Sequence, residues 1–253
     1  MRVAAGILLI TLLLYAAACL ALFAFQRSLI YFPQPKSYGG SSVTIILPSS
    51  GADILVTMRP HAGPKALIYF GGNAEDVSAS MASFARAFPD YAIYLLHYRG
   101  YGGSAGKPSE AAIHADAQAL FDKVHQDHAE IALVGRSLGS GVAVRLASER
   151  AAARLVLVTP YDSIEAIAAQ QFPYFPVRWL LTDKFDSARH APAIRVPTLI
   201  LRAEHDEVIP RASTERLHAT FAKGVATIVV IAGTGHNTIS ETAQYLDAMR
   251  AAL

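Results

Sequence analysis

A serine flanked by glycines is the residue best placed to act as a nucleophile. Ser137 lies in the sequence Gly-Arg-Ser-Leu-Gly of residues 135–139, after the apolar run 131–134 and before an Ala- and Val-rich stretch that extends to about Glu149. This pattern predicts a buried strand, a tight turn and a helix. Glycines on both sides of the serine would avoid clashes of β-carbons in so sharp a reversal. The Leu138 N–H, at the positive end of the helix, could then face a developing oxyanion.

A serine hydroxyl is a good nucleophile near neutral pH only beside a base that an acid orients. His236 is the candidate base, because it follows the last expected strand and the glycines of Gly-Thr-Gly-His-Asn would let the loop bring it over Ser137. The other eight histidines fit this role less well. Three acidic side chains follow the preceding strand: Glu204, Asp206 and Glu207. Asp206 is favoured because an aspartate has the shorter reach suited to the imidazole Nδ1–H, and Asp162 is an outside candidate.

Apolar runs that alternate with helical patterns predict an α/β fold. Strands are expected at 43–47, 54–58, 66–70, 91–96, 131–134, 154–158, 198–202 and 226–231. Helices are expected at 77–88, 109–126, from the serine turn to about 149, at 213–221 and at 238–251. The first two strands would form an antiparallel pair. The alternation that follows implies a mostly parallel sheet covered by helices on both faces.

These features together resemble the single-pass membrane serine hydrolases of the α/β-hydrolase superfamily. The strand, Gly-x-Ser-x-Gly turn and helix match the nucleophile elbow of that fold, in which Ser, Asp or Glu, and His follow one another along the chain. Further matches are Arg-Ser-Leu-Ile-Tyr-Phe-Pro at 27–33, Tyr-Phe-Gly-Gly-Asn-Ala-Glu at 69–75, Tyr-Arg-Gly-Tyr-Gly-Gly-Ser at 98–104, Phe-Asp-Ser at 185–187, Asp-Glu-Val-Ile-Pro at 206–210 and Gly-His-Asn at 235–237. The resemblance implies hydrolysis of esters, thioesters or lipids, and peptidase relatives add amides.

The backbone N–H of Asn73 is the expected second donor of an oxyanion hole. In this fold the second donor comes from the loop after an early strand, and Gly71-Gly72-Asn73 follows the strand expected to end at Phe70. A simple glycine turn is the alternative. Relatives usually carry His-Gly-Asn here, so the chain departs from the pattern at Gly71, a change that should leave the Asn73 amide available.

The N-terminal segment is apolar enough to cross a membrane. Val3 to Phe25 is a run of 23 residues without a charge, and as a helix it would be roughly 34 Å long. A retained anchor over 1–26 is favoured, since the run continues past Cys19. A signal peptide cleaved after residues 16–18 and a lipoprotein signal ending at Cys19 are the alternatives. Arg2 and Arg27 set the orientation weakly, with the catalytic domain, 27–253, slightly favoured outside the cytoplasm.

Residues 161–196 break the strict alternation and are too apolar for a solvated loop. We expect a small cap in which four aromatic side chains line or cover an acyl site: Phe172, Tyr174, Phe175 and Trp179. The alternative is that these rings only pack the cap onto the sheet. Asp183 and Asp186 are expected to be surface groups or helix caps. Tyr31 and Phe32 would lie either at a membrane interface or against the base of the domain.

Composition excludes several other classes of protein. The chain has 253 residues with 22 basic and 20 acidic side chains, a net charge of +2, so nothing indicates nucleic-acid binding. One cysteine allows neither a disulfide framework nor a cysteine zinc site, and the expected triad needs no metal or organic cofactor. The expected partner is an acyl or lipid substrate. A peptidase, an amidase, an acyl transferase and a noncatalytic binding protein remain alternatives, and the oligomeric state is not defined by sequence.

Overall fold

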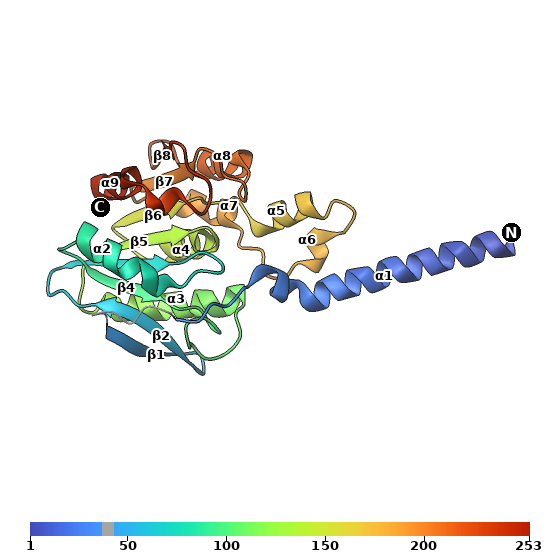
Figure 1. Cartoon of the computed structure of the whole chain (residues 1–253), viewed down its shortest axis with the longest axis horizontal. Coiled ribbons are helices and arrows are strands. Elements are labelled where there is room, and N and C mark those ends of the chain that lie inside the picture. Colours follow the sequence, from blue (N-terminus) through green and yellow to red (C-terminus); the bar gives the residue numbers. More distant parts are fainter. Residues whose placement is uncertain (37–42) are drawn as a thin grey trace.

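The computed structural model describes residues 1–36 and 43–253 and places an eight-stranded sheet between layers of helices (Figure 1). Residues 37–42, within the stretch that leads from the N-terminal helix to the sheet, lie outside the described residues. The strands are β1 (Val43–Ser49), β2 (Ala52–Arg59), β3 (Lys65–Phe70), β4 (Ala92–Leu96), β5 (Glu130–Arg136), β6 (Arg154–Val158), β7 (Thr198–Ala203) and β8 (Ala226–Ile231). They lie in the order β1-β2-β4-β3-β5-β6-β7-β8.

The sheet is parallel except at one edge. β1 pairs antiparallel with β2, and β2 pairs antiparallel with β4. Every pair from β4 to β8 is parallel. The predicted α/β class, antiparallel first pair and mostly parallel sheet are therefore confirmed. Parallel strands bring their carboxyl ends to one edge, where the residues that follow β3, β5, β7 and β8 meet.

The helices predicted outside residues 161–196 lie close to their predicted positions, and the segment 161–196 adds three short helices that were not predicted. The helices are α1 (Arg2–Ile30), α2 (Met81–Ala87), α3 (Glu110–Val124), α4 (Leu138–Glu149), α5 (Ile164–Gln171), α6 (Val177–Leu180), α7 (Ser187–His190), α8 (Arg211–Thr220) and α9 (Ala243–Ala252). The helix expected over 77–88 begins as a 3₁₀ turn, in which the Asp76 carboxylate accepts from the Ser78 N–H. The helix expected from 238 begins only at Ala243, where the Thr242 hydroxyl caps it.

Successive residues of the central strands pack into two separate cores. On one face of β3, Leu67 and Tyr69 contact a cluster that includes Phe84 of α2. On the other face, Ile68 and Phe70 join a cluster with side chains of α3 and α4. This alternation follows from the two-residue repeat of a strand, and it explains why β3 reads as a continuous apolar run.

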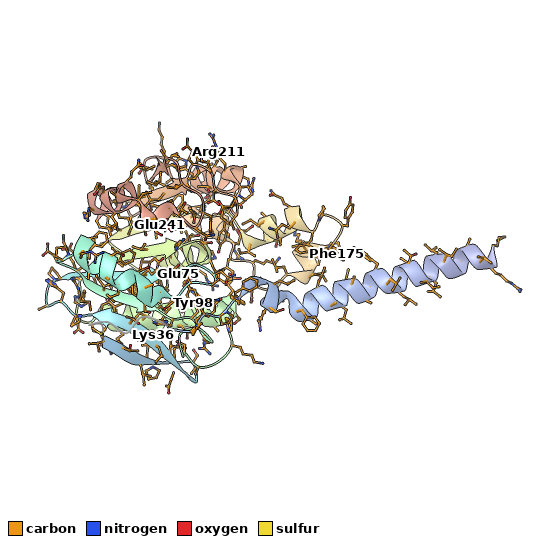
Figure 2. All side chains as sticks on the ribbon, in the orientation of Figure 1. Lys36, Glu75, Tyr98, Phe175, Arg211 and Glu241 are labelled. Atoms are coloured by element: carbon orange, nitrogen blue, oxygen red, sulfur yellow. The ribbon has the colours of Figure 1, made fainter. Side chains whose placement is uncertain are left out.

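The long helix α1 projects from the sheet and continues to Ile30, beyond the predicted anchor boundary at residue 26 (Figure 1). Most of its apolar side chains point outward without a neighbouring element (Figure 2). The helix is long and apolar enough to cross a membrane by length and composition. Directly after the helix, Tyr31 is buried in the core of the domain, whereas Phe32 is exposed.

Asp183 is buried, and the expectation of a surface group or cap is wrong for it. Its side chain is 6% exposed, and its carboxylate accepts hydrogen bonds from the Tyr31 hydroxyl at 2.9 Å and from Arg27 Nε at 3.1 Å. Burial and the adjacent Asp183 charge raise the pKa of the Tyr31 phenol. A buried carboxylate needs such partners, and here they tie the end of α1 to residues 161–196. Asp186, in contrast, caps α7 as expected.

The loop after β4 is fixed by a buried ion pair. The Arg99 guanidinium donates to both Asp116 carboxylate oxygens of α3, at 2.9 and 2.8 Å. In the same loop the Tyr98 hydroxyl donates to the Gly71 carbonyl and the Tyr101 hydroxyl to Asn73 Oδ1, each at 2.8 Å. The Arg99–Asp116 ion pair fixes the loop after β4, and the two tyrosines of that loop position the loop that follows β3, at the edge of the sheet where Ser137 lies.

Replacement of Asp116 by alanine should destabilise the fold by about 3 to 5 kcal/mol, because Arg99 would keep a buried charge without its partner. Asp122 provides the matched control. It also lies on α3 and pairs with an arginine, Arg150, but its side chain is 56% exposed against 1% for Asp116. Asp122→Ala should cost less than about 1 kcal/mol. Denaturant unfolding followed by circular dichroism measures both, and equal losses would contradict the prediction.

Candidate active site

Ser137 lies in a strained turn between β5 and α4. Its backbone has φ +47° and ψ −117°, outside the ordinary regions for a residue with a side chain. A β-carbon at Gly139 would lie 2.1 Å from the Phe70 carbonyl oxygen, and one at Gly135 would lie 2.4 Å from the Gly139 carbonyl oxygen. Both glycines are therefore required, as their positions around the serine predict: Gly139 because α4 starts directly against the end of β3, and Gly135 because the first turn of α4 lies against the end of β5.

The structure brings Ser137, His236 and Asp206 together in one chain of hydrogen bonds. His236 Nε2 lies 3.0 Å from Ser137 Oγ, and His236 Nδ1 lies 3.0 Å from both carboxylate oxygens of Asp206. The imidazole and the carboxylate are both buried. In this geometry the imidazole can take the serine proton at one nitrogen while the carboxylate holds the other nitrogen and stabilises the resulting positive charge.

The acids of the 204–207 loop have distinct partners. Asp206 Oδ1 also accepts from the N–H groups of Val208 and Ile209, which fixes the carboxylate. Glu207 instead accepts from the His236 backbone N–H at 3.0 Å, a bond that lowers the pKa of its carboxyl. Glu204 accepts from Gly233 N–H. Of the three, Asp206 alone contacts the imidazole.

Asp162, the outside candidate for the acid, has a different set of partners. Its carboxylate forms an ion pair with Arg216 Nε at 2.6 Å and accepts from the Ser213 hydroxyl at 2.6 Å. Both partners belong to α8, so Asp162 joins the end of β6 to that helix.

Asn73 and Leu138 line the same cavity as Ser137. Leu138 is the first residue of α4, so its N–H has no acceptor within the helix. The loop of Asn73 lies against the serine, since a β-carbon at Gly72 would be 3.5 Å from Ser137 Cβ. At Gly71, where the chain departs from the His of relatives, a β-carbon would lie 2.3 Å from Val77 Cγ1. The loop as folded therefore has no room for a side chain there.

The Asn73 side chain has a role that sequence reasoning missed. Its Oδ1 accepts from the Phe32 N–H at 2.9 Å and from the Tyr101 hydroxyl, and its Nδ2 donates to the Ile30 carbonyl. The amide thus joins the loop after β3 to the end of α1. An asparagine after two glycines is a signal only for a turn, so this contact could not be read from the sequence.

Glu75 and Arg136 form a second support that sequence reasoning missed. Glu75 accepts from the Gly72 N–H at 2.6 Å and the Tyr69 hydroxyl at 2.8 Å, and it lies 3.6 Å from Arg136 Nη1. Arg136, beside the serine, also donates to the Asn237 carbonyl. The pair connects the loop after β3, the serine turn and the His236 loop. The sequence signal that could have indicated this pair is that Glu75 and Arg136 carry opposite charges within motifs that are otherwise apolar or glycine-rich.

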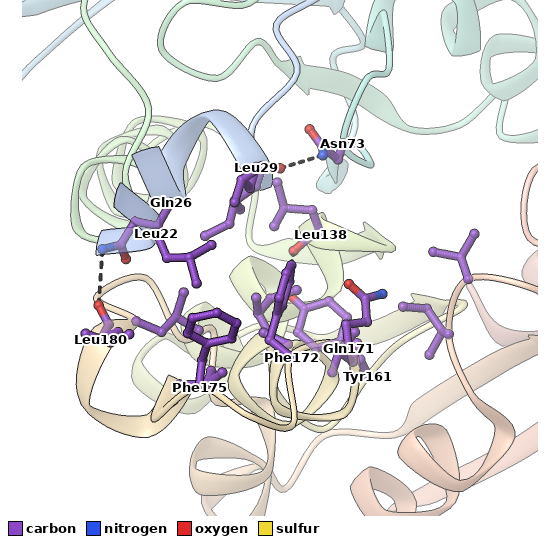
Figure 3. Close-up of a pocket in the computed structure, with 18 of the residues that line it drawn as sticks. Leu22, Gln26, Leu29, Asn73, Leu138, Tyr161, Gln171, Phe172, Phe175 and Leu180 are labelled. Atoms are coloured by element: carbon purple, nitrogen blue, oxygen red, sulfur yellow. Dashed lines mark hydrogen bonds between the residues drawn. The ribbon is translucent and has the colours of Figure 1, made fainter. Parts of the chain in front are cut away.

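An apolar cavity of about 250 Å³ adjoins Ser137 (Figure 3). Its walls come from α1, from α5 and α6, and from Val208 and Ile209. Phe172 and Phe175 line it, at positions where the sequence predicts an acyl site. The described residues contain no group of three His, Cys, Asp or Glu side chains that could hold a metal ion.

Tyr174 and Trp179 do not line the cavity, in contrast to the expectation for all four aromatic residues. Their side chains are 85% and 83% exposed. The cause for Trp179 is helical geometry, because Val177 and Leu180 of α6 share the face toward the cavity and leave the intervening position outside. Tyr174 lies in the turn between α5 and α6, where its carbonyl accepts from the Tyr15 hydroxyl.

Comparison with known proteins finds a matching family model, a sequence relative and solved structures of similar fold. A family model described as serine aminopeptidase, S33, matches residues 64–184. An uncharacterized protein of Mycobacterium tuberculosis H37Rv is 37% identical over 232 residues, which cover 84% of this chain and 80% of that protein. The Pyrococcus furiosus esterase Pf2001 superposes with a TM-score of 0.70 at 16% identity, over 87% of this chain and 97% of that one. Est1E of Butyrivibrio proteoclasticus, solved with ferulic acid bound, gives 0.65 at 16% identity, over 82% and 95%.

Glu75→Gln should lower kcat for a carboxylic ester about tenfold while KM changes less than about threefold. The amide keeps the shape of the side chain but removes the charge opposite Arg136, and small displacements of supporting groups are costly to catalysis. Glu241→Gln, an exposed residue near the His236 loop, is the control and should match wild type. A kcat equal to wild type in a stably folded Glu75→Gln variant would show that the pair does not position the site.

Proposed function

We propose that this chain, which has the α/β-hydrolase fold and matches the serine aminopeptidase S33 family model over residues 64–184, is a serine hydrolase of carboxylic esters or thioesters with apolar acyl groups. The observation that carries the proposal is the hydrogen-bonded chain Asp206–His236–Ser137 at an apolar cavity. The fold alone would not suffice, because it hosts many activities.

The reaction would follow the serine hydrolase mechanism. Ser137 Oγ attacks the acyl carbon while His236 Nε2 takes its proton, and the N–H groups of Leu138 and Asn73 stabilise the oxyanion. The tetrahedral intermediate then collapses, and the imidazolium protonates the departing alcohol or thiol to leave an acyl-enzyme. A water molecule, deprotonated by His236, attacks this ester and releases the acid. Each oxyanion donor would contribute on the order of 3 kcal/mol.

The cavity favours an acyl substrate over a peptide with a free amino terminus. An aminopeptidase needs a negative group near its nucleophile to bind the ammonium of the substrate. None of the described residues that line this cavity is acidic, and most are aliphatic or aromatic. Apolar walls with few polar groups suit an acyl chain. Acyl transfer to a nucleophile other than water uses the same triad, and product analysis distinguishes it.

We further interpret α1 as a retained membrane anchor. The helix has 29 residues and would be about 43 Å long, enough to cross the hydrocarbon core of a bilayer. Two contacts favour retention over cleavage after residues 16–18. The Tyr15 hydroxyl donates to the Tyr174 carbonyl at 2.9 Å, and the Tyr15 and Phe175 rings stack with centroids 5.7 Å apart. Placement of the domain outside the cytoplasm stays a prediction.

Asp206→Asn should lower kcat by about 10³- to 10⁴-fold, because the amide holds the imidazole in the wrong tautomer. Ser137→Ala and His236→Ala should abolish labelling by a fluorophosphonate probe. His205→Ala is the matched control, since His205 is an exposed neighbour of Asp206 whose side chain pairs with Glu204, and this variant should keep most of the activity. Labelling of the Ser137→Ala variant at the wild-type level, or no labelling of folded wild type, would contradict the proposal.

Phe172→Ala should shift ester preference towards longer acyl chains, because it enlarges the cavity. Trp179→Ala should leave the chain-length profile unchanged, since that ring lies outside the lining. Hydrolysis of p-nitrophenyl esters from four to sixteen carbons measures the profile. Identical shifts in the two variants would show that the cavity is not the acyl site.

A further inference from the structure

We propose that α1 forms part of the acyl-binding site, and that the substrate is an ester or thioester whose long acyl chain enters sideways from the bilayer. This inference rests on the proposed serine hydrolase function. It assigns Leu22 and Leu29 of the apolar helix as specificity-determining residues, in addition to the role of α1 as an anchor.

One face of α1 is a wall of the cavity that holds Ser137. The residues concerned are Leu22, Gln26, Leu29 and Ile30. Their spacing of four, three and one places them along a single stripe of the helix. Figure 3 shows this stripe opposite Phe172 and Phe175, with Leu138 between the two sides. The cavity is therefore continuous from the apolar helix to the nucleophile.

The wall is held in a fixed register by a buried polar residue. Gln26, which directly follows the apolar run 3–25, is only 8% exposed. Its Nε2 donates to the Leu180 carbonyl at 3.1 Å, and its Oε1 accepts from the Thr182 N–H and hydroxyl at 2.7 and 2.8 Å. Burial of an amide is favourable only with such partners. A helix that served merely as a tether would not need them.

The outer border of the cavity lies beside the apolar part of α1. Phe25 and Leu29 are exposed, and so are the rings of Tyr174 and Trp179 on the α5–α6 turn and α6. The bond from Tyr15 to the Tyr174 carbonyl places this turn beside the middle of α1. Aromatic side chains are common at the interface of a bilayer. With α1 in the membrane, an acyl chain could pass from lipid between α1 and α6 without exposure to water.

The test compares Leu22→Trp with Leu20→Trp in the full chain, in nanodiscs of phosphatidylcholine. Leu20 is 67% exposed, lies two residues away and does not line the cavity. Leu22→Trp should lower kcat/KM for a sixteen-carbon p-nitrophenyl ester at least tenfold relative to the four-carbon ester. Leu20→Trp should stay within twofold of wild type on both. Wild-type chain-length profiles in both active variants would overturn the role of α1.

A second measurement does not depend on hydrolysis. In Ser137→Ala nanodiscs, a phosphatidylcholine with a diazirine in its acyl chain should crosslink to Ile164 and Ile167, which line the cavity from α5, and Leu22→Trp but not Leu20→Trp should abolish this. Crosslinking only by a water-borne, albumin-bound diazirine fatty acid would overturn entry from the bilayer. If wild type hydrolyses no ester but the lipid still crosslinks as described, the hydrolase proposal alone fails.

Discussion

The contact between the start of α4 and the end of β3 is the constraint on which the site depends. With no side chain at Gly139, the helix backbone lies directly against the Phe70 carbonyl, and the turn before it carries Ser137 in a strained conformation. The same contact sets the loop after β3 beside the serine. Two further hydrogen bonds keep that loop in place: the Gly72 N–H donates to Glu75, and the Tyr98 hydroxyl donates to the Gly71 carbonyl.

The features that could be predicted from sequence are those with short-range or ordered signals. The glycines at 135 and 139 indicate a turn too tight for β-carbons on either side of Ser137. Ser137, Asp206 and His236 each follow an expected strand, and a parallel sheet brings the carboxyl ends of its strands to one edge. Long apolar runs report strands buried on both faces. These signals gave the α/β fold, and the structure brings the three side chains expected to act together within hydrogen-bonding distance.

The remaining features depend on contacts between residues far apart in the chain. Asp183 was expected at the surface because an acid usually lies there, but its partners come from the end of α1, 152 residues away for Tyr31. Trp179 was expected either to line or cover an acyl site or to pack the cap onto the sheet, but on the short helix α6 its side chain points outward. Composition predicts that a segment is apolar, whereas only the fold decides which face of it is covered.

The hydrogen bonds of Asn73 limit which helices could replace α1 in this chain. The same side chain that follows the glycine pair also binds backbone groups at the exit of α1. Anchors are commonly regarded as modules that one hydrophobic sequence can replace with another. Here a substitute helix of equal length and hydropathy would have to end in the same phase and direction, or the amide would lose its partners. The end of α1 and the loop after β3 thus depend on each other, and the two segments must evolve together.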